Sequence, residues 1–274
     1  MKNLALAIFI LYLSAITCEN NNLREQSAAK TNQNFMHFHN YAYVKSAAVA
    51  SRRSEGGYMN TWICTKDGKF YRYGGFSGIV SGTKPKTCTK MSINKEGEIY
   101  VVNKDGGLFL LKLIADNSYL WKQILKKDII DVSVGFNNEV LVVDKKGDIY
   151  YINKDKKGDK FSKKNFKKGC KSIAVTYEKE QTAYIVNKKG EVYRATAKKM
   201  TKLYPAIVVN DVDVDSYNNL YIASGSGIFV KRPTNPFLAQ IGDGIAKQLD
   251  CDKQHCWIIG DDEYVYQSSQ IKSN

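Results

Sequence analysis

Some of the residues that mark well-known folds and enzyme sites are scarce in this 274-residue chain. It has four prolines, three histidines and almost no stretch with the apolar spacing of an amphipathic helix. No nucleophile elbow, phosphate-binding loop or zinc-type histidine motif occurs. These absences disfavour a helical fold and the enzyme classes that such motifs mark, so the sequence predicts a non-enzymatic protein without a cofactor.

Metal-binding patterns are weak. His37 and His39 would share one face of a strand, but no third ligand accompanies them. Asp211, Asp213 and Asp215 alternate and could point three carboxylates one way, which leaves calcium open as an alternative. The other interpretation is that Asp215 caps the turn that follows it and that its two neighbours lie at a channel or strand edge.

A short pattern recurs six times: an apolar strand, a turn with lysine, aspartate or glycine, and a strand with an aromatic residue. Separations of 38, 41, 43, 36 and 37 residues relate Tyr71, Phe109, Tyr150, Tyr193, Phe229 and Tyr266. Nine residues earlier stand Trp62, Tyr100, Leu141, Tyr184, Leu220 and Trp257. A repeat of about 40 residues made of short strands is typical of a β-propeller, in which each repeat is one four-stranded blade.

The fold predicted is therefore all-β: a six-bladed β-propeller with four strands per blade. A further apolar strand precedes each hairpin, and a fourth is clearest in residues 119–124 and 236–241. The sixth repeat lacks a fourth strand, whereas residues 35–44 supply a spare one. We expect this N-terminal strand to close the last blade, because closure removes exposed sheet edges.

Both ends of the chain lie outside the predicted propeller, which spans residues 35–270. Residues 1–18 have a charged start, a short apolar run and small or polar residues, which predicts a signal peptide and a secreted protein without a transmembrane segment. Residues 19–34 read as a disordered leader, and residues 271–274 as a tail.

The repeat pattern bears on the cysteines. Cys64 stands where other repeats have valine or isoleucine, and Cys88 and Cys170 fall shortly before predicted strands, so we interpret all three as buried thiols. Cys251 and Cys256 flank a four-residue turn and could face each other across a hairpin, which suggests a disulfide between them.

Positive charge is concentrated in one part of the sequence. Residues 145–202 contain seventeen lysines and one arginine against six acidic residues, while the whole chain carries +14. Such a face should attract anionic polymers in a salt-sensitive manner, although single lysines also solubilise strand edges. The lysines that we assign to this face are Lys156, Lys157, Lys160, Lys163, Lys164, Lys167 and Lys168. Without a nucleic-acid-binding motif, nucleic acid is not an expected partner.

One repeat resembles the tectonin repeat. The resemblance rests on residues 121–124 (Trp-Lys-Gln-Ile), residues 129–135 ending in Val-Gly, residues 140–143, and Gly147 to Tyr150, with support from Trp62, Trp257, Tyr71-Arg72 and Tyr193-Arg194. It implies a six-bladed propeller that binds carbohydrate and performs no reaction. Trp62 and Trp257 belong to a repeat column, so we expect them to pack between blades.

Three functions remain open at this point. The favoured one is a secreted, non-enzymatic, tectonin-like lectin that binds carbohydrate or anionic cell-surface polymers. Residues 212–222 instead resemble a strand-turn-strand of NHL-type and gluconolactonase-like propellers, some of which are calcium-dependent hydrolases. The third is a secreted scaffold that docks another protein. Fold analogy alone cannot choose among them.

Overall fold

The computed structural model describes most of the chain after residue 37. The described residues are 38–42, 45–53, 59–72, 79–115, 118–126, 128–135, 139–155, 158–164, 169–176, 182–196, 199–204, 207–235, 237–252 and 255–268. The predicted signal peptide (1–18), leader (19–34) and tail (271–274) therefore lie outside them. All regular structure in the described residues is β-strand, and none of it is a helix that could cross a membrane.

Six hydrogen-bonded sheets make up the described part of the chain. The first has the order β2-β3-β4, with β2 Ser46–Arg53, β3 Met59–Thr65 and β4 Phe70–Arg72. The second has the order β5-β9-β8-β7-β6, with β5 Ile79–Gly82, β6 Lys90–Ile93, β7 Ile99–Val102, β8 Gly107–Ala115 and β9 Ser118–Lys126. The third has the order β10-β11-β12-β13, with β10 Ile129–Val134, β11 Val140–Asp144, β12 Ile149–Asp155 and β13 Gly158–Lys164.

The remaining three sheets each have four strands. The fourth has the order β14-β15-β16-β17, with β14 Cys170–Val175, β15 Ala183–Asn187, β16 Val192–Ala195 and β17 Met200–Lys202. The fifth has the order β18-β19-β20-β21, with β18 Val209–Val214, β19 Leu220–Ser224, β20 Gly227–Lys231 and β21 Ala239–Gly242. The sixth has the order β1-β24-β23-β22, with β1 Phe38–Ala42, β22 Ala246–Cys251, β23 Cys256–Gly260 and β24 Val265–Ser268.

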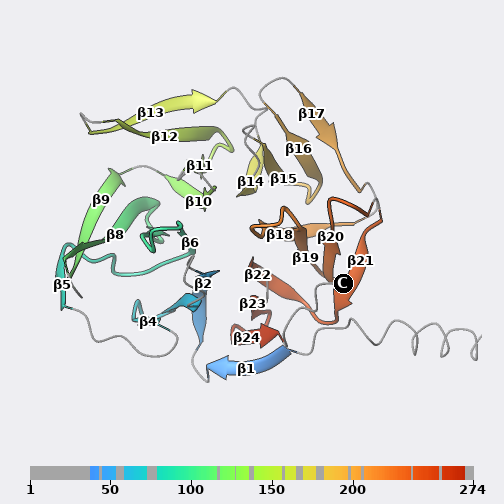
Figure 1. Ribbon diagram of the computed structural model, residues 1–274, viewed down its shortest axis with the longest axis horizontal. Helices are drawn as coiled ribbons and strands as arrows, with labels where there is room; N and C mark the ends of the chain where they lie inside the picture. The colour runs from blue at the N-terminus through green and yellow to red at the C-terminus, as the bar shows by residue number, and fades with distance from the viewer. Residues whose placement is uncertain are drawn as a thin grey trace, which may run out of the picture. The chain divides into compact units, whose positions relative to one another are not determined.

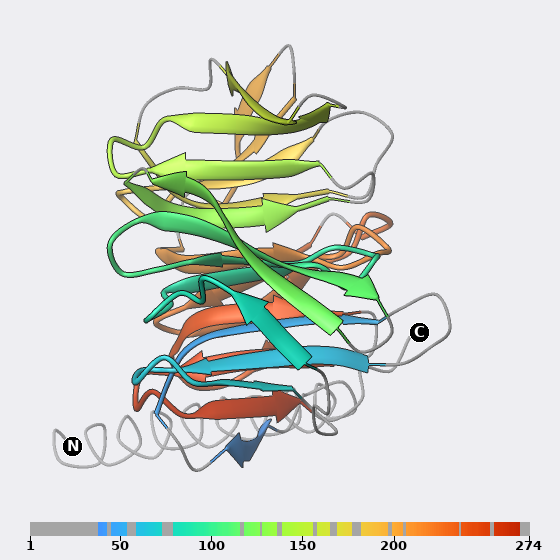
Figure 2. The ribbon, with the colours of Figure 1, turned by 90° about the vertical axis from the view of Figure 1, so that its left-hand side faces the viewer.

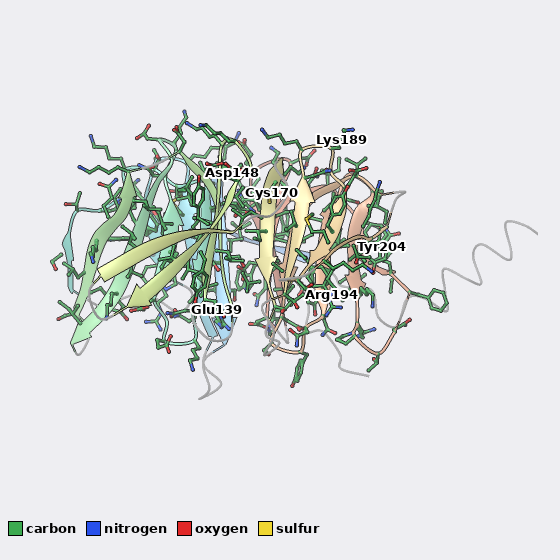
Figure 3. All side chains as sticks on the ribbon, turned by 90° about the horizontal axis from the view of Figure 1, so that it is seen from above. Glu139, Asp148, Cys170, Lys189, Arg194 and Tyr204 are labelled. Atoms are coloured by element: carbon green, nitrogen blue, oxygen red, sulfur yellow. A yellow bond between two sulfur atoms is a disulfide. The ribbon has the colours of Figure 1, made fainter. Side chains whose placement is uncertain are left out.

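The sheets are arranged around a common centre, as in a β-propeller (Figure 1). The innermost strand of each sheet contacts that of the next, from β2 through β6, β10, β14 and β18 to β22, and β22 also contacts β2. Within each sheet the strands run back and forth between two opposite faces (Figure 2). We call the face with the hairpins between the second and third strands of each sheet the hairpin face. Lys189 marks it in Figure 3.

The repeat predicted from the aromatic residues coincides with strand register. Tyr71, Phe109, Tyr150, Tyr193, Phe229 and Tyr266 each pair with a residue of the second strand of their sheet. The glycines expected in the tight hairpins have positive φ, for example 80° at Gly106 and 82° at Gly147. In the fifth sheet the hairpin is one residue shorter, so Tyr221, and not Leu220, occupies the position of Leu141.

The prediction of four strands in every sheet is wrong for the first two. The first sheet has three strands, because β5 pairs in parallel with β9 and becomes the outer edge of the second sheet. At the other end of the chain, β1 pairs antiparallel with β24, so that Asn40 lies opposite Tyr266. The sixth sheet therefore combines the N-terminal strand with the last three strands.

Apolar side chains fill the space between neighbouring sheets. One cluster joins Tyr100 and Leu108 of the second sheet to Val132 and Val142 of the third. Trp62 and Trp257 are 3% and 0% exposed, which confirms that they are packing residues. The position of Trp257 in the repeat predicted its burial, because large side chains pack between sheets at the equivalent positions of the other repeats.

The cysteines differ in part from the prediction. Cys251 and Cys256 lie opposite each other on β22 and β23 and form a disulfide. Cys64 and Cys88, which we predicted from the sequence to be buried thiols, form a second disulfide, so that prediction is wrong. Cys64 on β3 and Cys88 in the loop before β6 are 24 residues apart in the sequence, and they come together only when the chain folds. Cys170 is a free, buried thiol.

Candidate functional site

A layer of side chains surrounds the centre of the propeller near the hairpin face. The six residues occupy the same position on the six innermost strands, each opposite the same position of the second strand. They are Ala48, Lys90, Asp131, Ser172, Asp211 and Gln248. Five of the six are polar, and we call them, without Ala48, the axial polar layer.

The polar side chains satisfy backbone groups that a sheet edge leaves unpaired. An innermost strand has no neighbouring strand on the side that faces the centre, so the backbone N–H groups on that side need acceptors from other parts of the chain. Asp131 accepts a hydrogen bond from the backbone N–H of Ile173 at 2.9 Å, and Asp211 accepts one from Leu249 at 3.1 Å. In each case the acceptor belongs to the sheet that precedes the donor's sheet.

A second layer, two residues further along the strands, repeats this arrangement. Its acceptors are the side chains of Ser92, Ser133, Asp213 and Asp250, and their donors are the backbone N–H groups of Val134, Val175, Cys251 and Ser51 at 2.7–3.1 Å. Carboxylates that accept backbone hydrogen bonds stitch neighbouring sheets together. These residues therefore have a structural role.

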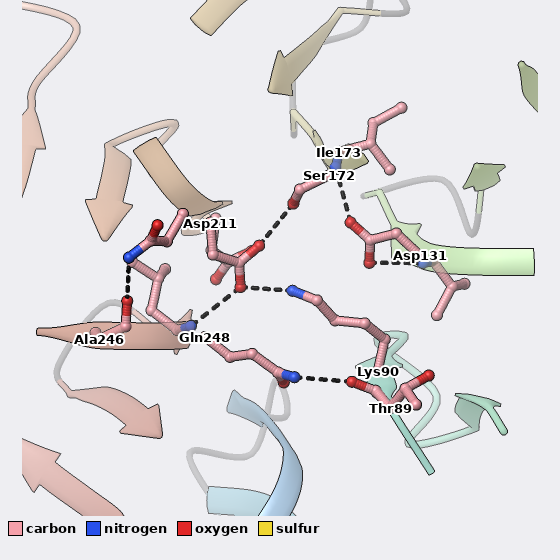
Figure 4. Close-up of polar contacts among 12 residues, drawn as sticks. Thr89, Lys90, Asp131, Ser172, Ile173, Asp211, Ala246 and Gln248 are labelled. Atoms are coloured by element: carbon pink, nitrogen blue, oxygen red, sulfur yellow. Dashed lines mark hydrogen bonds and ion pairs between the residues drawn. The ribbon is translucent and has the colours of Figure 1, made fainter. Parts of the chain in front are cut away.

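Lys90 is the member of the axial polar layer that needs a different explanation. Its Nζ lies 2.5 Å from Oδ2 of Asp211, although β6 and β18 lie on opposite sides of the centre (Figure 4). Asp211 also accepts a hydrogen bond from the Ser172 hydroxyl at 2.6 Å. The side chain of Asp211 is 2% exposed, whereas that of Lys90 is 19% exposed. The pair is thus largely buried, and Lys90 is the more exposed of its two side chains.

Gln248 completes the layer. Its Nε2 donates to the carbonyl oxygen of Thr89 at 2.8 Å (Figure 4). It also donates to the carbonyl oxygen of Ala47 at 3.0 Å, so Gln248 links the sixth sheet to the first and second. A carbonyl group of β2 and one of the residue directly before β6 are satisfied in this way.

Burial and charge shift the protonation equilibria at the centre. Burial, with the neighbouring Asp211 charge, raises the pKa of Asp131 to about 6, although the Lys90 charge opposes the shift. Burial also raises the pKa of Asp213 to about 7. For Lys90, burial acts to lower the pKa, but the charges of Asp211 and Asp131 outweigh it and the pKa is raised. Lys90 is therefore an ammonium ion at neutral pH, whereas the carboxyl group of Asp131 titrates near neutral pH.

The axial polar layer does not fit a divalent metal ion. The Lys90 ammonium occupies the place beside Asp211 that a cation would take, and calcium needs six to eight oxygen ligands. No group of three or more histidine, cysteine or acidic side chains in the described part of the chain is arranged to bind a metal. Asp215 caps its turn by accepting hydrogen bonds from the N–H groups of Tyr217 and Asn219, which confirms the alternative to calcium binding.

The lysine-rich face predicted from the sequence falls largely outside what the structure describes. Lys156, Lys157, Lys167 and Lys168 are not among the described residues, and Lys160, Lys163 and Lys164 lie on β13 with their side chains undescribed. Their strand is the outermost of its sheet, so the backbone brings none of these three to the axial polar layer. His37 also lies outside the described residues.

Sequence reasoning missed the axial polar layer, although a signal was present. An apolar run begins one residue after each member of the layer, at Met91, Val132, Ile173, Val212 and Leu249. A polar side chain directly before every apolar run looks like an ordinary strand boundary. Only the ring of sheets shows that these boundaries converge.

No protein-family model and no curated protein sequence matches the chain, so membership of the tectonin family is not supported. Several solved structures are similar in fold. A gluconolactonase from Xanthomonas campestris has a TM-score of 0.60 at 12% identity, covering 86% of this chain and 89% of that one. A protein described as a candidate gluconolactonase has a TM-score of 0.58 at 10% identity, covering 86% and 92%. A virginiamycin B lyase from Staphylococcus aureus, solved as an inactive variant with quinupristin, has a TM-score of 0.54 at 11% identity, covering 85% and 98%.

These similarities support a β-propeller fold and correct one expectation. The prediction of a non-enzymatic protein is wrong, because the similar structures include gluconolactonases, which are enzymes on this fold. At 10–12% identity the likeness shows the fold alone. The reaction must be argued from the residues of this chain.

Proposed function

We propose that this protein is a hydrolase of small esters, with cyclic esters (lactones) as the favoured substrates, acting at the axial polar layer of a six-bladed propeller. The observation that carries the proposal is the Lys90 ammonium group, which lies at the centre of the propeller close to the carboxyl groups of Asp211 and Asp131 from two other sheets. A fixed cation in a largely buried setting is the kind of group that stabilises a developing oxyanion.

Each residue has a role that follows from its position. Asp131 acts as the general base: it accepts a proton from a water molecule as the water attacks the ester carbonyl carbon. Lys90 stabilises the negative oxygen of the tetrahedral intermediate. The C–O bond then breaks, and the alcohol oxygen takes the proton from Asp131, so a lactone opens to a hydroxy acid. Asp211 keeps Lys90 charged and in place through their 2.5 Å contact.

Three observations support the assignment. The pKa of Asp131 is raised to about 6, near the pH at which a general base works best. The fold accommodates lactone hydrolysis in the proteins named as gluconolactonases. The mechanism uses no metal ion, in agreement with the position of Lys90, and so differs from the calcium-dependent alternative considered for the sequence.

The test is hydrolysis of a panel of γ- and δ-lactones and aryl esters by the full chain, followed by acid release at constant pH. We expect turnover that rises with pH through an apparent pKa near 6, because Asp131 must be ionised. Asp131→Asn should lower kcat by about 100-fold or more, as loss of a general base does. Lys90→Gln should lower kcat with little change in KM.

Asp213→Asn is the matched control. It neutralises a buried carboxyl one layer away that accepts a hydrogen bond from Cys251, and Asn retains an acceptor oxygen there. This variant should keep wild-type turnover. Absence of hydrolysis above the buffer rate for every substrate, or equal activity in Lys90→Gln and wild type, would refute the proposal.

Secretion and binding to anionic cell-surface polymers remain part of the proposal and are independent of the hydrolase site. The apolar residues near the N-terminus support a signal peptide, and the lysines of residues 145–202 support a salt-sensitive association. N-terminal sequencing of the exported protein tests the first. Binding to heparin and to lipopolysaccharide at rising salt tests the second, and affinity that does not change with salt would contradict it.

A further inference from the structure

A pocket of about 360 Å³ lies between the fourth and fifth sheets, away from the axial polar layer. Its lining residues are Tyr184, Arg194, Thr201, Leu203, Asn218, Lys231 and Pro233. The pocket is at the end of the sheets opposite the hairpin face, because Asn218 belongs to the turn between β18 and β19. Figure 3 shows Arg194 and Lys189 toward opposite ends of the fourth sheet. The pocket is therefore separate from the proposed hydrolase site.

The fourth sheet supplies one wall from three adjacent strands. Tyr184 on β15 pairs with Arg194 on β16, and Arg194 pairs with Thr201 on β17. The three side chains thus stand in a row across the sheet, on the face that also carries Val186 and Val192 toward the fifth sheet. This row presents an aromatic ring, a guanidinium group and a hydroxyl group.

The fifth sheet supplies the facing wall. Lys231, at the end of β20, pairs with Leu220, whose side chain packs toward the fourth sheet. The Lys231 Nζ is held by the carbonyl oxygens of Arg232 at 3.3 Å and Asn235 at 3.2 Å, which fixes its ammonium group. Both walls therefore carry a positive charge, and none of the lining residues that the structure describes is acidic.

An unused donor lies beside the Tyr184 wall. The Tyr204 hydroxyl is buried and has no hydrogen-bond partner among the described residues. Burial, followed by the neighbouring Tyr184 hydroxyl, raises the pKa of Tyr204 to about 12, so Tyr204 is a neutral donor at physiological pH. Buried hydroxyl groups without a partner are rare in folded proteins.

From these walls we infer that the pocket binds a small hydroxylated carboxylate, with sugar acids as the ligand class. The planar Arg194 guanidinium matches a carboxylate in two parallel hydrogen bonds, and Lys231 adds a second positive charge from the other wall. Thr201, Asn218 and Lys231 offer hydrogen bonds to ligand hydroxyl groups, and the Tyr184 ring packs against the apolar C–H face of a sugar ring. A pocket of this volume falls in the range of small-molecule sites.

The experiment is calorimetric titration of the oxidised full chain with glucuronate and gluconate, with glucose and inorganic phosphate as comparison ligands. We expect a single site that binds the sugar acids, binds glucose at least about tenfold more weakly, and prefers sugar acids to phosphate. Arg194→Ala should weaken sugar-acid binding by about 10- to 100-fold, the usual effect of losing hydrogen bonds to a charged group.

Lys189→Ala is the matched control, since it removes one positive charge from the same sheet at the hairpin face. It should bind sugar acids like wild type. Thr201→Val provides a second variant with the charge intact, and it should lose part of the affinity for glucuronate but none for phosphate. No binding of sugar acids at millimolar concentration, equal losses in the Arg194 and Lys189 variants, or tighter binding of phosphate would each overturn the inference.

Discussion

The ion pair between Lys90 and Asp211 provides the sharpest test of the central architecture. Replacing Lys90 with methionine keeps the length and apolar stem of the side chain but removes the ammonium group 2.5 Å from Asp211. Asp211, which is 2% exposed, would keep the hydrogen bonds from Ser172 and Leu249 but would lose its ion-pair partner. We expect Lys90→Met to lower the free energy of unfolding by about 3–5 kcal/mol, the usual cost of breaking a buried ion pair on one side.

Urea denaturation at pH 7.5, followed by the fluorescence of the three tryptophans, measures this loss. The midpoint of thermal unfolding should fall by on the order of 10 °C. The double variant Lys90→Met/Asp211→Asn should recover most of the stability, since it removes the unpaired charge and keeps an acceptor for Leu249. A loss below about 1 kcal/mol in the single variant, or a double variant less stable than the single one, would show that the pair does not bridge the propeller as described.

Three further predictions concern the same scaffold. Asp131 and Asp213 have pKa values raised above the unfolded value near 3.8, to about 6 and about 7, so their contribution to stability is full below pH 4 and is lost as the pH rises through 7. In chemical denaturation between pH 5 and 8, the free energy of unfolding should therefore decline less steeply with pH in Asp213→Asn than in wild type. Parallel declines in the two proteins would contradict a buried carboxyl group at Asp213. Trp257 is 0% exposed, so Trp257→Ala should cost about 3–5 kcal/mol in urea denaturation, whereas Tyr217→Ala, at an exposed turn, should cost less than about 0.5 kcal/mol. The Cys64–Cys88 disulfide spans 24 residues and the Cys251–Cys256 disulfide spans five. Replacing both cysteines of the first with serine should therefore lower the free energy of unfolding by about 3–4 kcal/mol, and the same change in the second by about 2 kcal/mol. The reverse order would argue against loop entropy as the cause.

The sequence by itself determined the repeat and therefore the class of fold. Side chains alternate between the two faces of a strand, and tight hairpins require glycine at positive φ. Residues equivalent to Tyr150 and Gly147 therefore occur at similar spacing in most repeats. The burial of Trp62 and Trp257 followed from the same columns. These features are local, because each depends on residues within one hairpin.

Only the tertiary structure decided which polar residues meet. Lys90 and Asp211 are 121 residues apart, and each looks like a strand boundary in its own repeat. They come together because the innermost strands surround a common centre, where a side chain of one sheet reaches the opposite sheet. The same holds for the pairing of β5 with the second sheet, for the Cys64–Cys88 disulfide, and for the pocket of Arg194 and Lys231. Contacts between repeats depend on how the sheets pack, so they produce no regular spacing of residues in the sequence.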